Sequence, residues 1–151
     1  MISATGWWNI ASSFFCTQYL VKIKLSTKIG LYIKMNKMPQ LIALLFDARN
    51  KAHIAHLQTT SYAQHKALEE FYNAVIDIAD SLAENHQGRN GIINDYPVVN
   101  NPSDAVQLVA TLRSWVDANR ADCGSENEIQ NIIDTLQSLN NETLYKLNNL
   151  R

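Results

Sequence analysis

Four stretches of the chain repeat apolar residues at intervals of three and four, the spacing that places them on one face of an α-helix. The pattern predicts helices over 39–59, 62–86 and 103–121, and a fourth from 125 to the end of the chain. The residues expected to face the core are Leu41, Leu44, Leu45, Ala48, Ala52, Ala55, Leu68, Phe71, Val75, Ile78, Ala79, Leu82, Val106, Val109, Leu112, Trp115, Val116, Ile129, Ile132, Ile133, Leu136, Leu139, Leu144, Leu147 and Leu150. Short connections between such helices predict an all-α fold, an antiparallel up-down bundle of four helices.

Punctuating residues set the predicted ends of these helices. Pro39 suits a first helical turn, where no backbone amide is needed, and Thr59–Ser61 can cap the second helix. Gly88 is expected to stop that helix, and the turn-rich residues 88–102 exclude a long helix. Ser125–Glu128 has the pattern of a capping box and is expected to begin the last helix.

The first 37 residues do not share the helical pattern of the rest. The apolar run 7–21 is interrupted by polar residues and is too short for a confident membrane span. We therefore expect 1–37 to be a weakly structured extension and 38–151 to be the bundle domain. Met35 and Met38 are natural starts for the bundle, so a wrong start choice would also explain the extension.

Charge divides the chain in the same place. Residues 1–46 hold five lysines and no acidic residue, whereas 47–151 hold 14 acidic and eight basic residues and carry −6. The basic arm Lys22–Lys37 is therefore a candidate for contacts with DNA phosphates, which attract lysines through charge. Only Cys16 and Cys123 are present, so no disulfide framework is expected and a reducing cytosol is the predicted compartment.

Candidate chemistry gathers on the second predicted helix. Imidazole and carboxylate groups are ligands that suit iron and zinc. If His65 is placed at 0° on a helical wheel, Glu69 falls near 40°, Asp80 near 60° and Glu84 near 100°, while the apolar stripe spans roughly 220–320°. These four side chains share an arc beside the core, so a metal site built from them would lie at an interface between chains.

The spacing of these residues resembles that of Dps proteins, the ferritin-like proteins that oxidise iron and protect DNA in starved bacteria. The Dps ferroxidase pattern of steps of 12, 4, 11 and 4 residues lands here on His53, His65, Glu69, Asp80 and Glu84, with His56 as an alternative first ligand. Asp80-Ser-Leu-Ala-Glu84 is also similar to the family's Asp-x-Ile-Ala-Glu segment.

The resemblance implies a ferritin-like bundle that assembles at least as a dimer in the cytoplasm. It implies iron binding by His53, His65, Glu69, Asp80 and Glu84 at a site between two subunits, with oxidation of ferrous iron by peroxide or oxygen. The protein would then sequester iron and protect against oxidative damage.

A second interpretation needs no metal. An amphipathic helix requires polar residues on its wet face, and Glu and Asp are common there. The protein is then a non-catalytic helical interaction protein, of a phage or mobile element, that kept the bundle and lost the chemistry. In either interpretation His86 is expected at the surface, and Cys123 is expected as an inert surface or boundary residue.

Overall fold

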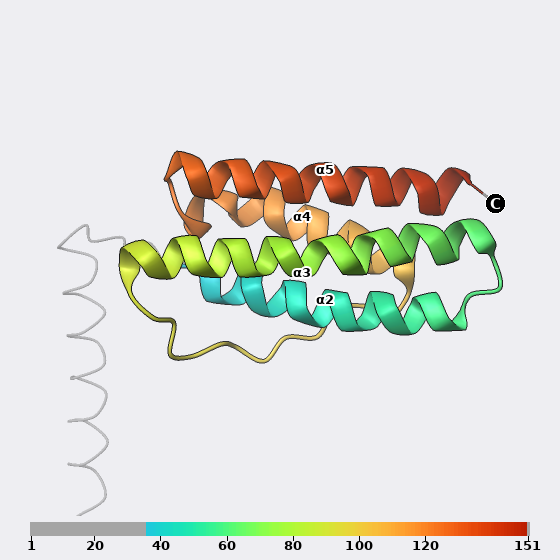
Figure 1. Ribbon diagram of the computed structural model, residues 1–151, viewed down its shortest axis with the longest axis horizontal. Helices are drawn as coiled ribbons and strands as arrows, with labels where there is room; N and C mark the ends of the chain where they lie inside the picture. Colours follow the sequence, from blue (N-terminus) through green and yellow to red (C-terminus); the bar gives the residue numbers. More distant parts are fainter. Residues whose placement is uncertain (1–35, 151) are drawn as a thin grey trace, which may run out of the picture. The chain divides into compact units, whose positions relative to one another are not determined.

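The computed structural model describes residues 36–150, which form four α-helices (Figure 1). They are α2 (Met38–Gln58), α3 (Tyr62–Asn90), α4 (Ala105–Cys123) and α5 (Asn127–Asn149). Within this range there is no β-strand, so the predicted all-α fold is confirmed. Residues 1–35, which include most of the predicted extension and four of its five lysines, lie outside the described residues.

The four predicted apolar stripes face one another and form a single core. All six predicted core residues of α3 are buried, and α2 adds Met38 and Ile42 to its predicted set. The largest side chain that is fully buried is Phe71 of α3. Leu150 is the clearest exception, because it follows the end of α5 and is exposed.

Contacts between helices fix their directions. Arg89 near the end of α3 pairs with Glu128 at the start of α5, and Glu70 near the start of α3 pairs with Lys146 near the end of α5. At the start of α2, the amide of Lys37 donates to the carbonyl oxygen of Asp122 at the end of α4 over 2.9 Å. The helix pairs α3–α5 and α2–α4 are therefore each antiparallel.

The simple up-down order predicted from the sequence is wrong in one respect. Since α2–α3, α3–α5 and α4–α5 are each antiparallel, the consecutive helices α3 and α4 run in the same direction (Figure 1). The connection 91–104 crosses the length of the bundle to make this possible. Ferritin-like bundles also have one long crossover connection. This likeness concerns only the order and direction of the helices.

This crossover connection is held against α2 by polar side chains. The backbone amide of Asn101 and its Nδ2 both donate to Oδ2 of Asp47, over 2.7 and 2.9 Å. Nδ2 of Asn101 also donates to the carbonyl oxygen of Leu44, and Lys51 donates to Asn100. The buried Asn101 therefore anchors an otherwise exposed segment.

The ends of the helices agree only in part with the predicted signals. Ser61 caps α3 as expected, with Oγ accepting from the amide of Gln64 over 3.3 Å. Gly88 does not stop α3, which continues to Asn90; Gly91 ends it, because its φ of 86° favours glycine. The predicted capping box is also wrong, since α5 begins after Glu126 without a side-chain cap.

His86 and Cys123 are buried, contrary to prediction. His86 is only 7% exposed, and Nδ2 of Asn36 lies 3.1 Å from its Nε2. Nδ2 of Asn90 lies 3.3 Å from Nδ1 of the same ring, and because amide nitrogens donate, these contacts favour a neutral imidazole. Burial lowers the pKa of His86, while the charge of Glu126 opposes this shift. The sulfur of Cys123 lies 3.5 Å from the carbonyl oxygen of Asn119.

Candidate interaction surface

Three of the predicted ligands, His53, His56 and His65, meet where α2 ends and α3 begins. The rings of His56 and His65 stack with centroids 3.7 Å apart and planes inclined by 26°. Nδ1 of His56 lies 2.9 Å from the carbonyl oxygen of His65, and Nδ1 of His65 lies 3.1 Å from the carbonyl oxygen of His56. A carbonyl oxygen only accepts, so both contacts assign the proton of each ring to Nδ1.

The position of His56 in the sequence explains this reciprocal pair. The last four carbonyl groups of a helix have no amide donor within that helix, and His56 is in the last turn of α2. The ring of His65 supplies the missing donor from the first turn of α3. The two histidines therefore close the α2–α3 hairpin rather than present both ring nitrogens to a ligand.

Tyr72 extends this group of rings along the seam between α2 and α3. His53 stacks on Tyr72 with centroids 4.2 Å apart and planes 18° from parallel, and His56 meets the same ring edge-on at 5.3 Å. Cζ of Arg49 lies 5.8 Å from the centroid of Tyr72, within the range of a cation–π contact. These rings and the guanidinium bind α2 to α3.

The predicted carboxylate ligands do not join the histidines within one chain. Glu69 pairs with Lys66, whose hydrogen bond and charge lower the pKa of Glu69, and the same contact raises the pKa of Lys66. Asp80 and Glu84 are exposed, and Asp80 lies about 22 Å beyond His65 along α3 at 1.5 Å per residue.

No metal site is assembled within residues 36–150. No group of three or more His, Cys, Asp or Glu side chains in this part of the chain could hold a metal ion. Glu69 is engaged by Lys66, and Asp80 and Glu84 lie far along α3 from the histidine rings, so these residues do not form one iron centre in the single chain. No helix in the same range is long and apolar enough to cross a membrane.

Comparison with known families shows which family the chain belongs to. The model of a family of unknown function, DUF5856, matches residues 56–147. The chain belongs to this family. It is also 34% identical over 58 residues to an uncharacterized 14.6 kDa protein from the mobD-ri intergenic region of Enterobacteria phage T4. That match covers 38% of this chain and 45% of the phage protein, less than half of either, and no solved structure matches.

The Dps-like assignment is therefore wrong, and with it the function as a ferroxidase that sequesters iron. The reason lies in the helical period. Positions 4, 15 and 19 residues after His65 all return to one side of a helix, so any wet face can supply this spacing. The assignment of His53, His65, Glu69, Asp80 and Glu84 as ligands shared between subunits stays a prediction that rests on spacing alone.

Sequence reasoning missed the apolar side chains that surround this corner of the bundle. Ile54 is 55% exposed, Leu57 72% and Tyr62 78%. Phe46, further back on α2, is 39% exposed. The available signal was that Phe46, Ile54 and Leu57 fall outside the apolar stripe of α2, where polar residues are expected.

We define the α2–α3 face as the outward surface along the seam of these two helices. On α2 most of its residues lie three or four apart, and Tyr72 of α3 borders the seam through its contacts with Arg49 and His53. The α2–α3 face comprises Phe46, Arg49, His53, Ile54, Leu57, Tyr62, His65, Lys66, Glu69, Tyr72, Ile76, Asp77, Asp80 and Glu84.

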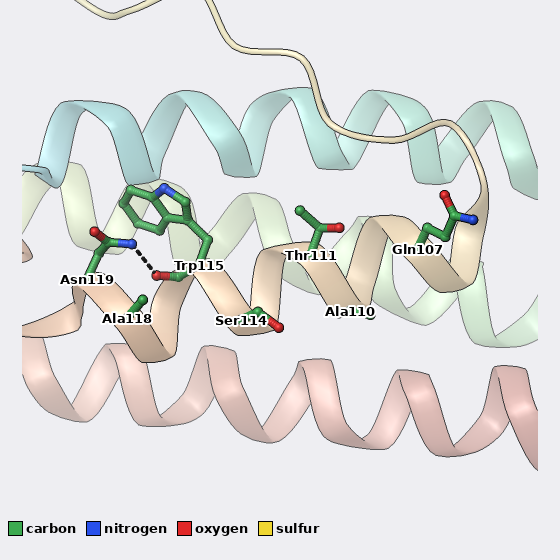
Figure 2. Close-up of a pocket in the computed structure, with 7 residues that line it drawn as sticks. All are labelled: Gln107, Ala110, Thr111, Ser114, Trp115, Ala118 and Asn119. Atoms are coloured by element: carbon green, nitrogen blue, oxygen red, sulfur yellow. Dashed lines mark hydrogen bonds between the residues drawn. The ribbon is translucent and has the colours of Figure 1, made fainter.

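Two hollows mark the described surface. One, of about 270 Å³, lies in the α2–α3 turn and is lined by Thr59, Thr60, Ser61, Tyr62 and His65. The other is a groove of about 660 Å³ along α4, lined by Gln107, Ala110, Thr111, Ser114, Trp115, Ala118 and Asn119 (Figure 2). The α4 groove has no charged side chain in its lining, and Nδ2 of Asn119 donates to the carbonyl oxygen of Trp115 over 2.7 Å.

Proposed function

We propose that the protein is a non-catalytic helical-bundle interaction protein that binds another protein through its α2–α3 face. The observation that carries this proposal is the exposure of Ile54, Leu57 and Tyr62 around the corner where α2 ends and α3 begins. Contiguous apolar side chains at a surface are typical of sites that bind proteins. Charged and aromatic groups along the same face would border this apolar contact.

The energy available from these side chains is adequate for association. Complete burial of one large apolar side chain contributes ~1.5–3 kcal/mol. Leu57 and Tyr62 have most of their surface left to bury, and Ile54 has about half. Together these three side chains would supply several kcal/mol, which is the usual scale of the central residues of an interface.

The setting that we propose is a phage or mobile element. It is supported by the similarity to an uncharacterized protein of Enterobacteria phage T4. The cytoplasm of the host is the compartment that we propose, supported by the absence of a disulfide framework among only two cysteines.

Site-specific photo-crosslinking tests this function in bacterial cells that produce the full chain. A benzophenone amino acid placed at Leu57 should form a discrete crosslinked product on irradiation. The matched control is the same probe at Ser138, an exposed position on α5. Equal yields at both positions, or no product at Leu57, would contradict a protein-binding role for the α2–α3 face.

A loss-of-contact variant gives a second measurement. Leu57→Ser combined with Tyr62→Ser should abolish a product formed by a probe at Ile54, because both replaced side chains are exposed neighbours in the patch. Circular dichroism should show an unchanged helix content, since neither side chain belongs to the core. Retention of the full crosslinking yield would count against the apolar corner as the binding element.

A further inference from the structure

We propose that the partner of the α2–α3 face is a second copy of this chain, packed face to face about a two-fold axis. This inference rests on the proposed function and names its partner. It rests on the order of charged and apolar side chains along the α2–α3 face. When one copy is turned end for end against the other, the charged and apolar regions of the two faces lie opposite complementary regions.

The two ends of the face differ in charge. Lys66 lies at the end with the stacked histidine rings, where it pairs with Glu69, and Arg49 lies over Tyr72. Asp77, Asp80 and Glu84 lie on the later half of α3, and positions 67–88 contain no Lys or Arg. In the described part of the chain, these three carboxylates form no ion pair.

The middle of the face is apolar and aromatic. Tyr72 lies midway along α3 between Lys66 and Asp80, and Ile76 follows it by one turn. Arg49 of α2 lies over Tyr72, so Phe46, almost one turn earlier in the antiparallel helix, reaches the level of Ile76. Phe46, Tyr72 and Ile76 are all only partly buried within one chain.

A two-fold axis through the middle of the face satisfies both features. It places the end of each copy that carries Lys66 opposite the acidic end of the other, so Lys66 faces Asp80 and Glu84 twice. It also brings the two apolar middles together. A two-fold axis along the helices would instead set α3 of one copy over α2 of the other and would leave Lys66 far from Asp80 and Glu84.

The size of the face suits a stable dimer. The 21 residues of α2 extend over about 31 Å, and two adjacent helices are about 20 Å across. The projected area is therefore about 600 Å², and the accessible area of such a ridged surface is larger. Specific interfaces bury about 800 Å² per partner.

Sedimentation equilibrium of the purified full chain tests this dimer. The unaltered protein should sediment as a dimer at low salt, at concentrations up to about 100 µM. Asp80→Lys with Glu84→Lys should raise the dissociation constant by about tenfold or more, because attraction becomes repulsion at both ends. Glu142→Lys, which changes an exposed carboxylate on α5, should leave the dissociation constant unchanged.

A charge-swap experiment makes the geometry specific. Lys66→Glu should weaken self-association as well, because the carboxylate introduced into each copy would face Asp80 and Glu84 of the other. An equimolar mixture of this variant with Asp80→Lys, Glu84→Lys should recover a heterodimer through the reversed pairs. Recovery requires the antiparallel arrangement, since only that arrangement sets position 66 opposite positions 80 and 84.

The outcomes separate this inference from the proposed function. A monomer at all concentrations, or a double variant as dimeric as the unaltered chain, overturns the two-fold dimer. If the probe at Leu57 then crosslinks to a product that is not twice the mass of the chain, the proposed function stands with a different partner. A monomer with no crosslinked product overturns both.

Discussion

The two helical hairpins of the bundle, α2–α3 and α4–α5, are held together by different chemistry. In α2–α3 the contacts across the seam are mainly between rings, with His56 on His65 and His53 on Tyr72. In α4–α5 they are polar. Arg120 donates to Gln130 over 3.0 Å and to Asp134 over 2.7 Å, and Gln137 donates to Asp117 over 2.5 Å.

This difference leaves different groups exposed on the two hairpins. The outward polar groups of α4–α5 satisfy one another across the seam, as Asp134 does with Arg120. On α2–α3, Asp77, Asp80 and Glu84 form no ion pair within residues 36–150, and Leu57 remains exposed. The first hairpin therefore combines three carboxylates that form no ion pair with exposed apolar side chains at its turn.

The largest expected effect tests the rings of the first hairpin. We expect His56→Ala to lower the free energy of unfolding by about 2–3 kcal/mol, because it empties a buried site and removes the donor to the carbonyl of His65. Urea denaturation followed by circular dichroism measures the change. Leu57→Ala, at the next and exposed position, should change stability by less than about 0.5 kcal/mol; equal effects would refute the structural role of the ring pair.

The turn of the second hairpin should be nearly as sensitive. Gly124 has a φ of 149°, and a Cβ there would lie 2.8 Å from Oε2 of Glu126 and 3.1 Å from Cγ2 of Ile129. We therefore expect Gly124→Ala to cost about 1–3 kcal/mol by the same measurement.

Gly88 provides the matched control for that substitution. It lies inside α3, and a Cβ there would meet nothing within 4 Å. Gly88→Ala should therefore stabilise the protein by about 0.5–1 kcal/mol. The structural role of Gly124 in this turn is refuted if Gly124→Ala and Gly88→Ala shift the urea midpoint in the same direction.

The turn of the first hairpin depends on a cap instead of a glycine. Ser61→Ala removes the acceptor for the amide of Gln64 and should lower stability by about 1 kcal/mol. Ser61→Asp, which keeps an acceptor at the N-terminus of α3, should retain most of the stability. A thermal melt that places the two variants at the same midpoint would argue against the cap.

The smallest expected effect concerns pH. All four histidines lie on α2 or α3, and burial lowers the pKa of His86 below its ordinary value of 6.5, partly offset by the charge of Glu126. As pH falls below about 6.5, the unfolded chain takes up this proton before the folded chain does. The contribution of neutral His86 to stability is therefore complete above that pH and is lost as the pH falls towards its lower folded-state pKa.

Unfolding measured between about pH 7.5 and pH 5 checks this direction. The unaltered protein should lose more stability over this range than His86→Gln, whose neutral amide can still contact Asn36. An identical pH dependence in the two proteins would show that His86 does not contribute.

The periodicity of the sequence by itself determined the four helices and most of their buried faces. All six expected core residues of α3 are buried, and Ser61 caps that helix as predicted. These features follow from local geometry, because the period of 3.6 residues and the preference of serine for a helix start act within a few residues.

Only the tertiary structure decided the remaining features, because each depends on residues far apart in sequence. The shared direction of α3 and α4 follows from contacts with α2 and α5. His86 is buried next to Asn36, which is 50 residues earlier. The same holds for the predicted ligands: the helical period placed His65, Glu69, Asp80 and Glu84 on one arc, but the ring of His56 and the ammonium of Lys66 determine which of them are already engaged.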